Sequence, residues 1–176
     1  MTPATTLPRY RLLLLRHAKS AWPDGVPDHD RPLAGRGLKA APSMGRYMAR
    51  EKLVPDLALV STARRTRETW ALVATELPST IERRDAGDIY EAPVERLGAV
   101  LRAADPEVRT LLLVGHNPGF QDLALDLIGE GEADSLSLLR YKFPTGALAV
   151  IDFTAGWQDV KSGSGKLERF VLPRSL

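Results

Sequence analysis

The 176-residue sequence contains no cysteine, which excludes disulfide bridges, thiolate zinc sites, iron–sulfur clusters and a cysteine nucleophile. It also lacks a long apolar run, because the stretch Leu12–Leu15 is far too short for a signal-peptide core or a membrane span. The net charge of +2 is too small for a dedicated nucleic-acid binder. We therefore expect a cytoplasmic protein that binds neither a membrane nor nucleic acid.

The sequence is 44% hydrophobic, which is enough to build a core for one domain. Its charge is unevenly distributed along the chain. Residues 1–70 hold 13 Lys and Arg against 6 Asp and Glu, whereas residues 71–176 hold 11 against 16. A basic first part of this kind indicates that the ligand is a small anion.

Short apolar runs alternate with amphipathic stretches, as in a parallel sheet covered by helices. Strands are expected at residues 12–15, 54–60, 80–83 and 110–114, and helices at 38–53, 61–77, 93–103 and 118–129. The chain then continues into an antiparallel hairpin at a sheet edge, formed by residues 147–153 and 167–172. The pattern predicts an α/β fold, a three-layer α/β/α sandwich with a mostly parallel central sheet. A single domain is expected over residues 9–173, after a loose tail at residues 1–8.

Local signals refine the expected helix boundaries. Pro42 lies inside the first helical stretch and predicts a kink or a late start. Ser61 can cap the second helix. Asn117 suits the N-cap of the fourth helix, with Pro118 at its first helical position.

Basic side chains and imidazoles gather where the predicted parallel strands end. Arg16 and His17 follow the first strand, Arg65 lies one helical turn beyond the second, and His116 follows the strand that ends at Val114. Open parallel sheets bind ligands at the carboxyl ends of their strands. Two predicted helix N-termini point to the same edge and add partial positive charge. These stretches contain no carboxylate before Glu68, so we expect a cationic cup for a dianionic phosphoryl group.

Each of these residues also has an ordinary structural interpretation when it is taken alone. Arg65 can be a solvated surface charge, and His116 can cap or pack against the helix that follows it. Their convergence on one sheet edge favours a functional site. In the Pro/Asp-rich loop at residues 21–33, a surface turn with an exposed His29 is favoured over a metal site built from Asp24, Asp28, His29 and Asp30.

Five segments carry a resemblance to a known family. They are L-L-L-L-R-H-A-K-S at 12–20, R-P-L-A-G-R-G at 31–37, S-T-A-R-R-T-R-E-T at 61–69, V-G-H-N-P-G at 114–119 and K-F-P-T-G-A-L-A-V-I-D-F at 142–153. In this order they resemble the histidine phosphatase superfamily, which also contains the phosphoglycerate mutases. Ala18 stands where many members have glycine, a variant that resembles the small bacterial SixA-type branch of phosphohistidine phosphatases.

The resemblance implies a phosphoglycerate mutase-like fold and a mechanism. His17 would be the nucleophile that forms a phosphohistidine intermediate, with its other ring nitrogen held by a backbone carbonyl or similar acceptor. Arg16 and Arg65 would bind the non-bridging phosphoryl oxygens, and His116 would donate a further hydrogen bond, most effectively when protonated. No metal ion and no other cofactor is expected, because the cationic side chains stabilise the developing charge.

Four further residues are weaker candidates. Glu91 lies in about the region where relatives carry a proton donor, although a solvated or capping carboxylate is an equal interpretation. Lys19, Ser20 and Asn117 are expected to support phosphate binding. Glu91 stands in no diagnostic motif.

The expected function is hydrolysis of a phosphoryl group, with inorganic phosphate as a product. The substrate would be a phosphohistidine protein or a similarly labile small phosphate, because a protonated nitrogen leaves without a dedicated acid. Two alternatives remain open: a broad-specificity small-molecule phosphomonoesterase of the same superfamily, and a non-catalytic module that binds a phosphorylated ligand.

Overall fold

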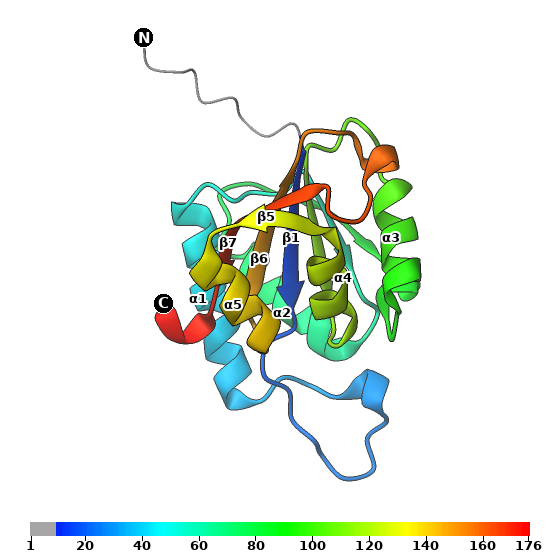
Figure 1. The fold of residues 1–176 in the computed structure, drawn as a ribbon. Coiled ribbons are helices and arrows are strands. Elements are labelled where there is room, and N and C mark those ends of the chain that lie inside the picture. The colour runs from blue at the N-terminus through cyan, green and yellow to red at the C-terminus, as the bar shows by residue number, and fades with distance from the viewer. Residues whose placement is uncertain (1–9) are drawn as a thin grey trace.

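Residues 10–176 are described by the structure, a computed structural model, and within them seven strands form one mixed sheet (Figure 1). The strands lie in the order β3-β2-β4-β1-β6-β7-β5. Their bounds are β1 Tyr10–Arg16, β2 Leu57–Val60, β3 Glu82–Asp85, β4 Thr110–Gly115, β5 Ile128–Gly131, β6 Leu148–Phe153 and β7 Gly165–Val171. The first four run parallel to one another, whereas β6 is antiparallel to both β1 and β7. The tail expected at residues 1–8 lies outside the described residues.

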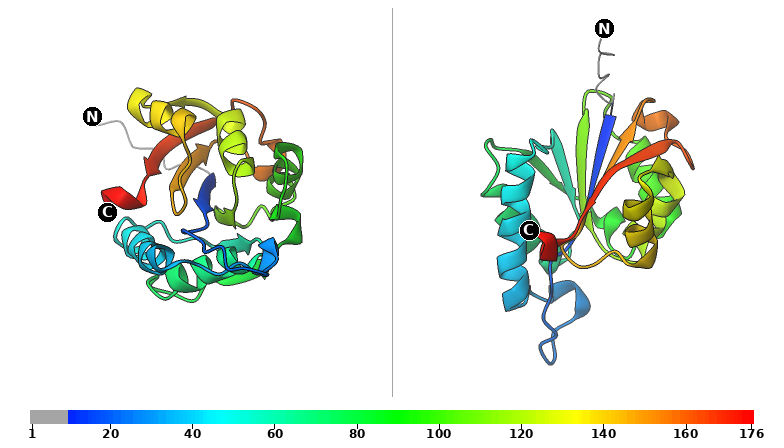
Figure 2. Two further views of the ribbon diagram at one scale, coloured as in Figure 1. Left: turned by 90° about the horizontal axis from the view of Figure 1, so that it is seen from below. Right: turned by 60° about the vertical axis from the view of Figure 1, so that its left-hand side comes forward.

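Helices cover both faces of this sheet, as Figure 2 shows. The helices α1 Gly35–Arg50 and α2 Arg64–Ala74 lie on one face, and α3 Val94–Arg102, α4 Gly119–Leu127 and α5 Ala133–Tyr141 lie on the other. The expected three-layer α/β/α sandwich is therefore confirmed. In the part of the chain that the structure describes, no helix is both long and apolar enough to cross a membrane.

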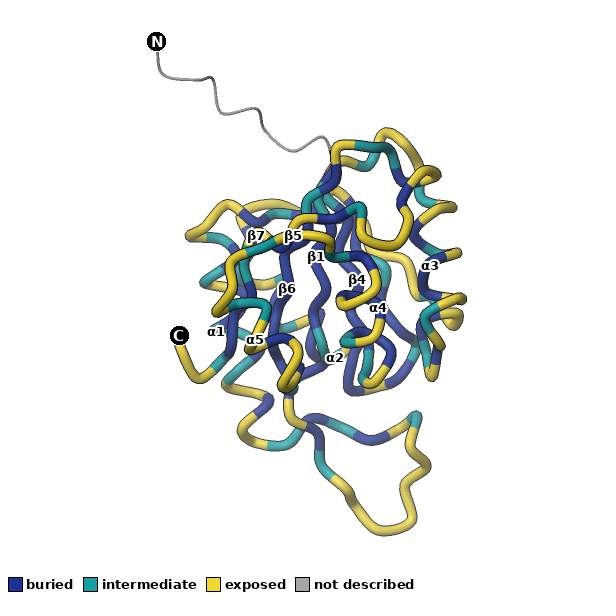
Figure 3. The backbone as a smooth tube through the Cα atoms, in the orientation of Figure 1, coloured by how far each residue is buried: buried dark blue, intermediate teal, exposed yellow. Residues whose placement is uncertain are grey.

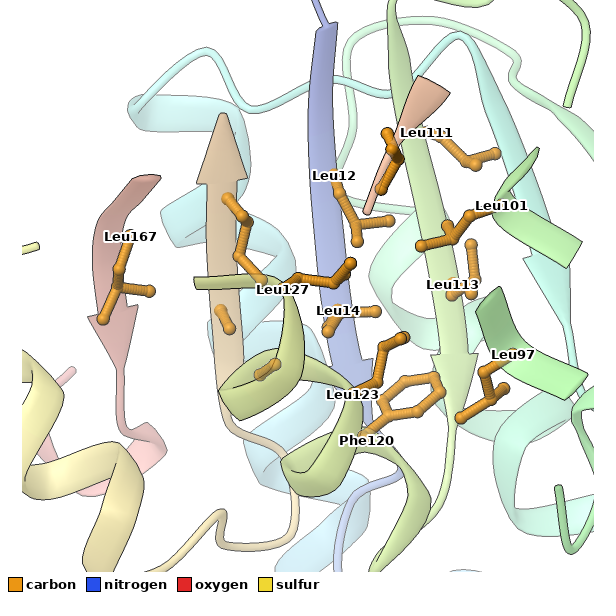
Figure 4. Close-up of a cluster of buried hydrophobic side chains, with 14 of the residues drawn as sticks. Leu12, Leu14, Leu97, Leu101, Leu111, Leu113, Phe120, Leu123, Leu127 and Leu167 are labelled. Carbon is orange, nitrogen blue, oxygen red and sulfur yellow. The ribbon is translucent and has the colours of Figure 1, made fainter. Parts of the chain in front are cut away.

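The central strands are buried on both faces, which explains their unbroken apolar sequence (Figure 3). Leu12 and Leu14 belong to the cluster on the α3 and α4 side, which Figure 4 shows, whereas Leu13 and Leu15 belong to the cluster under α1 and α2. Each buried leucine side chain stabilises the fold by about 1.5–3 kcal/mol. The four leucines therefore make β1 one of the central strands on which both helical layers pack.

The strand register aligns the carboxyl ends of three strands at one edge of the sheet. Arg16 at the end of β1 is paired with Gly115 at the end of β4, and Val60 of β2 is paired with Val114 of β4. The residues that follow these strands therefore leave the sheet side by side, as the sequence predicted.

Three expected helix starts are corrected by the structure. The helix α1 begins early, at Gly35, and continues through Pro42, because the face that carries Met44 and Met48 is buried against the sheet. The helix α2 begins at Arg64, three residues after Ser61, because the N–H of Ser61 still donates to the carbonyl oxygen of Val114 at the sheet edge.

The helix α4 also begins later than expected, at Gly119, so that Pro118 and not Asn117 is its N-cap. The side chain of Asn117 nevertheless stabilises the first turn, because its Oδ1 accepts a hydrogen bond from the N–H of Gln121 at 3.2 Å.

Two elements were not predicted, β5 and α5. The strand β5 has the sequence I-G-E-G and pairs in parallel with β7, so it lies outside the confirmed β6–β7 hairpin and forms that edge of the sheet. The helix α5 buries only Leu139 completely, and its sequence therefore carries a weak amphipathic signal.

We predict that Gly37→Ala destabilises the protein by about 1–3 kcal/mol, because an added Cβ would overlap the backbone carbonyl oxygen of Lys19. That backbone follows His17, so the segment near the sheet edge must shift. Urea denaturation of the variant measures the change in the free energy of unfolding.

Gly35→Ala in the same helix is the matched control. Nothing lies within 4 Å of its added Cβ, and alanine favours a helix by up to about 1 kcal/mol over glycine. Equal stability of the two variants would contradict the close approach at Gly37.

Candidate active site

The four side chains that the sequence placed at one sheet edge line a single cavity of about 760 Å³. Arg16 and His17 lie at the end of β1, Arg65 is in the first turn of α2, and His116 follows β4. The rings of His17 and His116 are 5.4 Å apart between centroids. The structure therefore brings the two guanidinium groups and the two imidazoles together.

The ring of His17 is buried and held in one orientation. Its Nδ1 lies 2.8 Å from the carbonyl oxygen of Ala18. Because a carbonyl oxygen only accepts, Nδ1 carries the ring hydrogen and Nε2 is left with a free lone pair. Burial lowers the pKa of His17 to about 3, which keeps the ring neutral near pH 7.

His116 is held through its other nitrogen. Its Nε2 lies 2.7 Å from the hydroxyl oxygen of Ser61, and that oxygen also accepts a hydrogen bond from the N–H of Ala63 at 3.4 Å. The Ser61 hydroxyl can then donate its hydrogen to Nε2, which leaves the ring hydrogen of His116 on Nδ1. Burial, and then the charge of Arg65, lower the pKa of His116 to about 3. Burial therefore favours the neutral ring of His116, which can still donate a hydrogen bond through Nδ1.

Both arginines are anchored by the terminal nitrogens of their side chains. Arg16 Nη1 donates to the carbonyl oxygen of Phe143 at 2.9 Å. Arg65 Nη1 and Nη2 donate to the backbone carbonyl oxygen of Asp28 at 2.7 Å and to its Oδ2 at 3.1 Å. Among residues 10–176, the Nε atoms of Arg16 and Arg65 and the Nδ1 of His116 are buried without a hydrogen-bond partner. These three nitrogens belong to side chains that line the cavity, and buried polar groups without a partner call for an explanation such as a bound ligand.

Asp28 was not predicted as a site residue, and it corrects the expectation of a cup without carboxylates. Its carboxylate accepts hydrogen bonds from Tyr90 at 2.6 Å, from Arg31 at 2.9 Å and from Arg65 at 3.1 Å. The hydrogen bond from Tyr90, followed by those from the two arginines, holds the pKa of Asp28 well below its usual range. The spacing of Asp28 and Arg31, which form an i,i+3 ion pair, was a signal that the sequence did contain.

Arg31 fixes the loop that carries Asp28. Its buried side chain donates to the carbonyl oxygen of Ala21 and to the hydroxyl of Ser20, and its guanidinium lies 3.2 Å from the ring centroid of Trp22. Residues 21–33 therefore form an ordered wall of the cavity, and not merely a surface turn.

His29 is half-buried in this wall, contrary to the expectation that it is exposed. Its Nε2 lies 2.9 Å from the hydroxyl oxygen of Thr62, and its ring meets Tyr90 edge-on. Within the described residues, no group of three or more His, Asp and Glu side chains is placed to hold a metal ion.

The four weaker candidates, Glu91, Lys19, Ser20 and Asn117, also line the cavity. Glu91 is exposed and has a φ of 53°, which places it on a sharp turn before α3. The hydroxyl of Ser20 is held by Arg31, and the side-chain amide of Asn117 donates to the carbonyl oxygen of Phe143 at 3.2 Å. Their contribution to phosphate binding stays a prediction.

Comparison with known proteins identifies the family. The model of the histidine phosphatase superfamily (branch 1) matches residues 12–87. The chain is 34% identical to SixA from Agrobacterium tumefaciens, whose structure is assigned as a phosphohistidine phosphatase, with 93% of this chain and 98% of that chain covered and a TM-score of 0.79. This chain belongs to the histidine phosphatase superfamily.

Two further relatives align with nearly the whole chain. SixA from Nakamurella multipartita, also assigned as a phosphohistidine phosphatase, is 29% identical, with 93% and 96% of the chains covered and a TM-score of 0.80. The protein Rv1276c of Mycobacterium tuberculosis is 39% identical over 162 residues, which cover 91% of this chain and 100% of that protein. The likeness to the SixA structures places the chain with the SixA-type branch and supports phosphatase activity on a phosphorylated substrate.

The two neutral histidines predict how stability depends on pH. Above a pH of about 6.5 the rings are neutral in both the folded and the unfolded chain; below it the unfolded chain takes up protons, whereas the folded chain resists them down to about pH 3. The free energy of unfolding should therefore fall as the pH drops through this window, by up to about 1.4 kcal/mol per pH unit for each ring.

Urea denaturation between about pH 7 and pH 4 measures this slope. The double variant His17→Asn, His116→Asn is the control, because it keeps every carboxylate and loses both rings. A slope in the double variant as steep as in the parent would show that these rings do not produce it.

Proposed function

We propose that this protein is a phosphatase that transfers the phosphoryl group of its substrate to Nε2 of His17 and then to water. The observation that carries the proposal is that a neutral His17, held in one orientation, shares one cavity with the side chains of Arg16, Arg65 and His116, each of which has a buried nitrogen without a partner. A nucleophile with a free lone pair and a set of fixed donors is what phosphoryl transfer needs.

The proposed reaction has two steps. The lone pair on Nε2 of His17 forms a bond to phosphorus as the bond from phosphorus to the leaving group breaks. Water then attacks the phosphohistidine, the P–N bond breaks, inorganic phosphate leaves, and Nε2 regains its lone pair. The hydrogen bond from Nδ1 to the carbonyl of Ala18 keeps Nε2 directed to the cavity in both steps.

The other three side chains stabilise the phosphoryl oxygens. Arg16 and Arg65 contribute guanidinium charge in a fixed position, because Phe143 and Asp28 hold their terminal nitrogens. His116 contributes its Nδ1–H, which the hydroxyl of Ser61 directs by occupying Nε2. These groups need no reorganisation as charge develops, so the proposal requires no metal ion.

The proposed substrate is a phosphohistidine protein or a similarly labile small phosphate. The SixA structures that resemble this chain are assigned as phosphohistidine phosphatases. Once protonated, the ring nitrogen of a phosphohistidine substrate leaves without help from a strong acid. A second candidate substrate, a small phosphomonoester, is favoured by the position of Glu91 on the cavity wall, where a carboxyl group could protonate a leaving oxygen.

Replacement of the nucleophile separates turnover from binding. We predict that His17→Ala lowers the hydrolysis of both a phosphohistidine peptide and an aryl phosphate by more than about 10³-fold, while inorganic phosphate still binds. Rates come from phosphate release, and binding comes from isothermal titration calorimetry.

Arg65→Lys keeps the positive charge but loses the planar guanidinium group with its paired donors. It should lower the rate of hydrolysis by roughly 10²–10³-fold while the nucleophile His17 stays intact.

Unchanged turnover in His17→Ala would contradict the phosphatase proposal and leave the binding module as the function.

Glu91→Gln tests the proton donor. If Glu91 protonates the leaving group, hydrolysis of an alkyl phosphate should fall by about 10²-fold, whereas hydrolysis of phosphohistidine should change little. Glu95→Gln is the matched control, because Glu95 lines the same cavity at the start of α3. Equal retention of both activities in Glu91→Gln would remove Glu91 from the mechanism.

A further inference from the structure

A second cavity of about 590 Å³ lies beside the site and shares Arg16, Lys19 and Thr145 with it. We call it the basic pocket. Its walls come from segments that are far apart in the sequence: the chain after β1, the start of α1, the end of α5 with the residues that follow it, and the segment after β7. A group bound here would therefore be close to the phosphoryl group bound at His17.

The basic pocket is lined by five cationic side chains and by no aspartate or glutamate, namely Arg16, Lys19, Arg36, Lys142 and Arg174. Within residues 10–176, no ion pair or side-chain hydrogen bond links Lys19, Arg36, Lys142 or Arg174 to another residue. All four are exposed, so their charges are available to a ligand. The concentration of one sign of charge in a hollow attracts an anionic partner.

The rim of the basic pocket also carries apolar surface at the end of α5. Tyr141 is 86% exposed and Leu138 is 42% exposed, and both line the pocket. Exposed aromatic and aliphatic groups beside arginines are typical of surfaces that bind other proteins. A lone second phosphate would contact the cations and leave these two side chains unused.

We infer that the basic pocket binds an acidic segment of a phosphorylated protein substrate, with its carboxylates on Arg36, Lys142 and Arg174 and its neighbouring side chains on Tyr141 and Leu138. The inference rests on the proposed phosphatase function, because it names the kind of substrate that the site at His17 receives. The pocket raises the affinity for the substrate and takes no part in the reaction at phosphorus.

The test compares two phosphohistidine peptides that differ only in the residues near the phosphorylated position, Asp and Glu in one and Asn and Gln in the other. The full chain should show a kcat/KM about 10-fold higher for the acidic peptide, expressed mainly in KM, and the preference should shrink as salt is added. An aryl phosphate has no flanking segment, so its rate of hydrolysis measures the activity of the site at His17 without the basic pocket.

The double variant Lys142→Glu, Arg174→Glu should lose the preference for the acidic peptide while it hydrolyses the aryl phosphate within about 2-fold of the parent rate. Lys161→Glu is the control for reversal of a surface charge away from the pocket. It lies in the loop between β6 and β7, and because β6 is antiparallel to β1 this loop is at the opposite end of the sheet from the site. The control should keep the preference in full.

Equal kcat/KM for the two peptides with the parent chain would overturn the inference, as would an unchanged preference in the double variant. A double variant that binds inorganic pyrophosphate more weakly than the parent but keeps the preference for the acidic peptide would also overturn the inference and would assign the pocket to a second phosphate. If neither peptide nor aryl phosphate is hydrolysed, the proposed function fails. Fluorescence anisotropy then still measures how tightly the unphosphorylated acidic and neutral peptides bind the protein. Equal binding of the two peptides would also overturn the inference.

Discussion

The parallel pairing of β1 with β4 is the constraint on which the site depends. Arg16 is in register with Gly115, and the N–H of His17 donates to the carbonyl oxygen of Gly115 at 3.0 Å. The two segments that carry the imidazoles therefore leave the sheet as neighbours. A slip of one residue would bring Arg11 or Arg16 into a fully buried leucine position, so the arginines that flank the four leucines protect the register and with it the geometry of the site.

Charge in the site is balanced locally, in a way that composition does not reveal. Asp28 neutralises much of the charge of Arg65 and Arg31, and burial keeps both imidazoles neutral. Of the carboxylates that line the cavity, Asp28 accepts hydrogen bonds from Arg31, Arg65 and Tyr90, whereas three buried nitrogens of Arg16, Arg65 and His116 have no partner. An incoming dianion meets prepared N–H groups without a large excess of buried like charge, which would itself destabilise the folded chain.

The parallel core and the ends of its strands could be predicted from the sequence, because a strand buried on both faces is a continuous apolar run and the rule for ligand position needs no side-chain coordinates. The wall formed by residues 21–33 could not. It depends on contacts such as the one between Tyr90 and Asp28, which are 62 positions apart and show no periodicity. Likewise β5, with two glycines among its four residues, and α5, with one fully buried side chain, lack the patterns that reveal strands and helices.

The stacking of Arg31 on Trp22 has a practical consequence. Trp22 is 74% exposed at the mouth of the cavity, whereas Trp70 and Trp157, the other two tryptophans of the chain, are 3% and 1% exposed. An aqueous quencher such as iodide can reach the first indole and is kept from the others. The protein therefore carries its own optical reporter, and its intrinsic emission follows the state of the loop that frames the site without any attached dye.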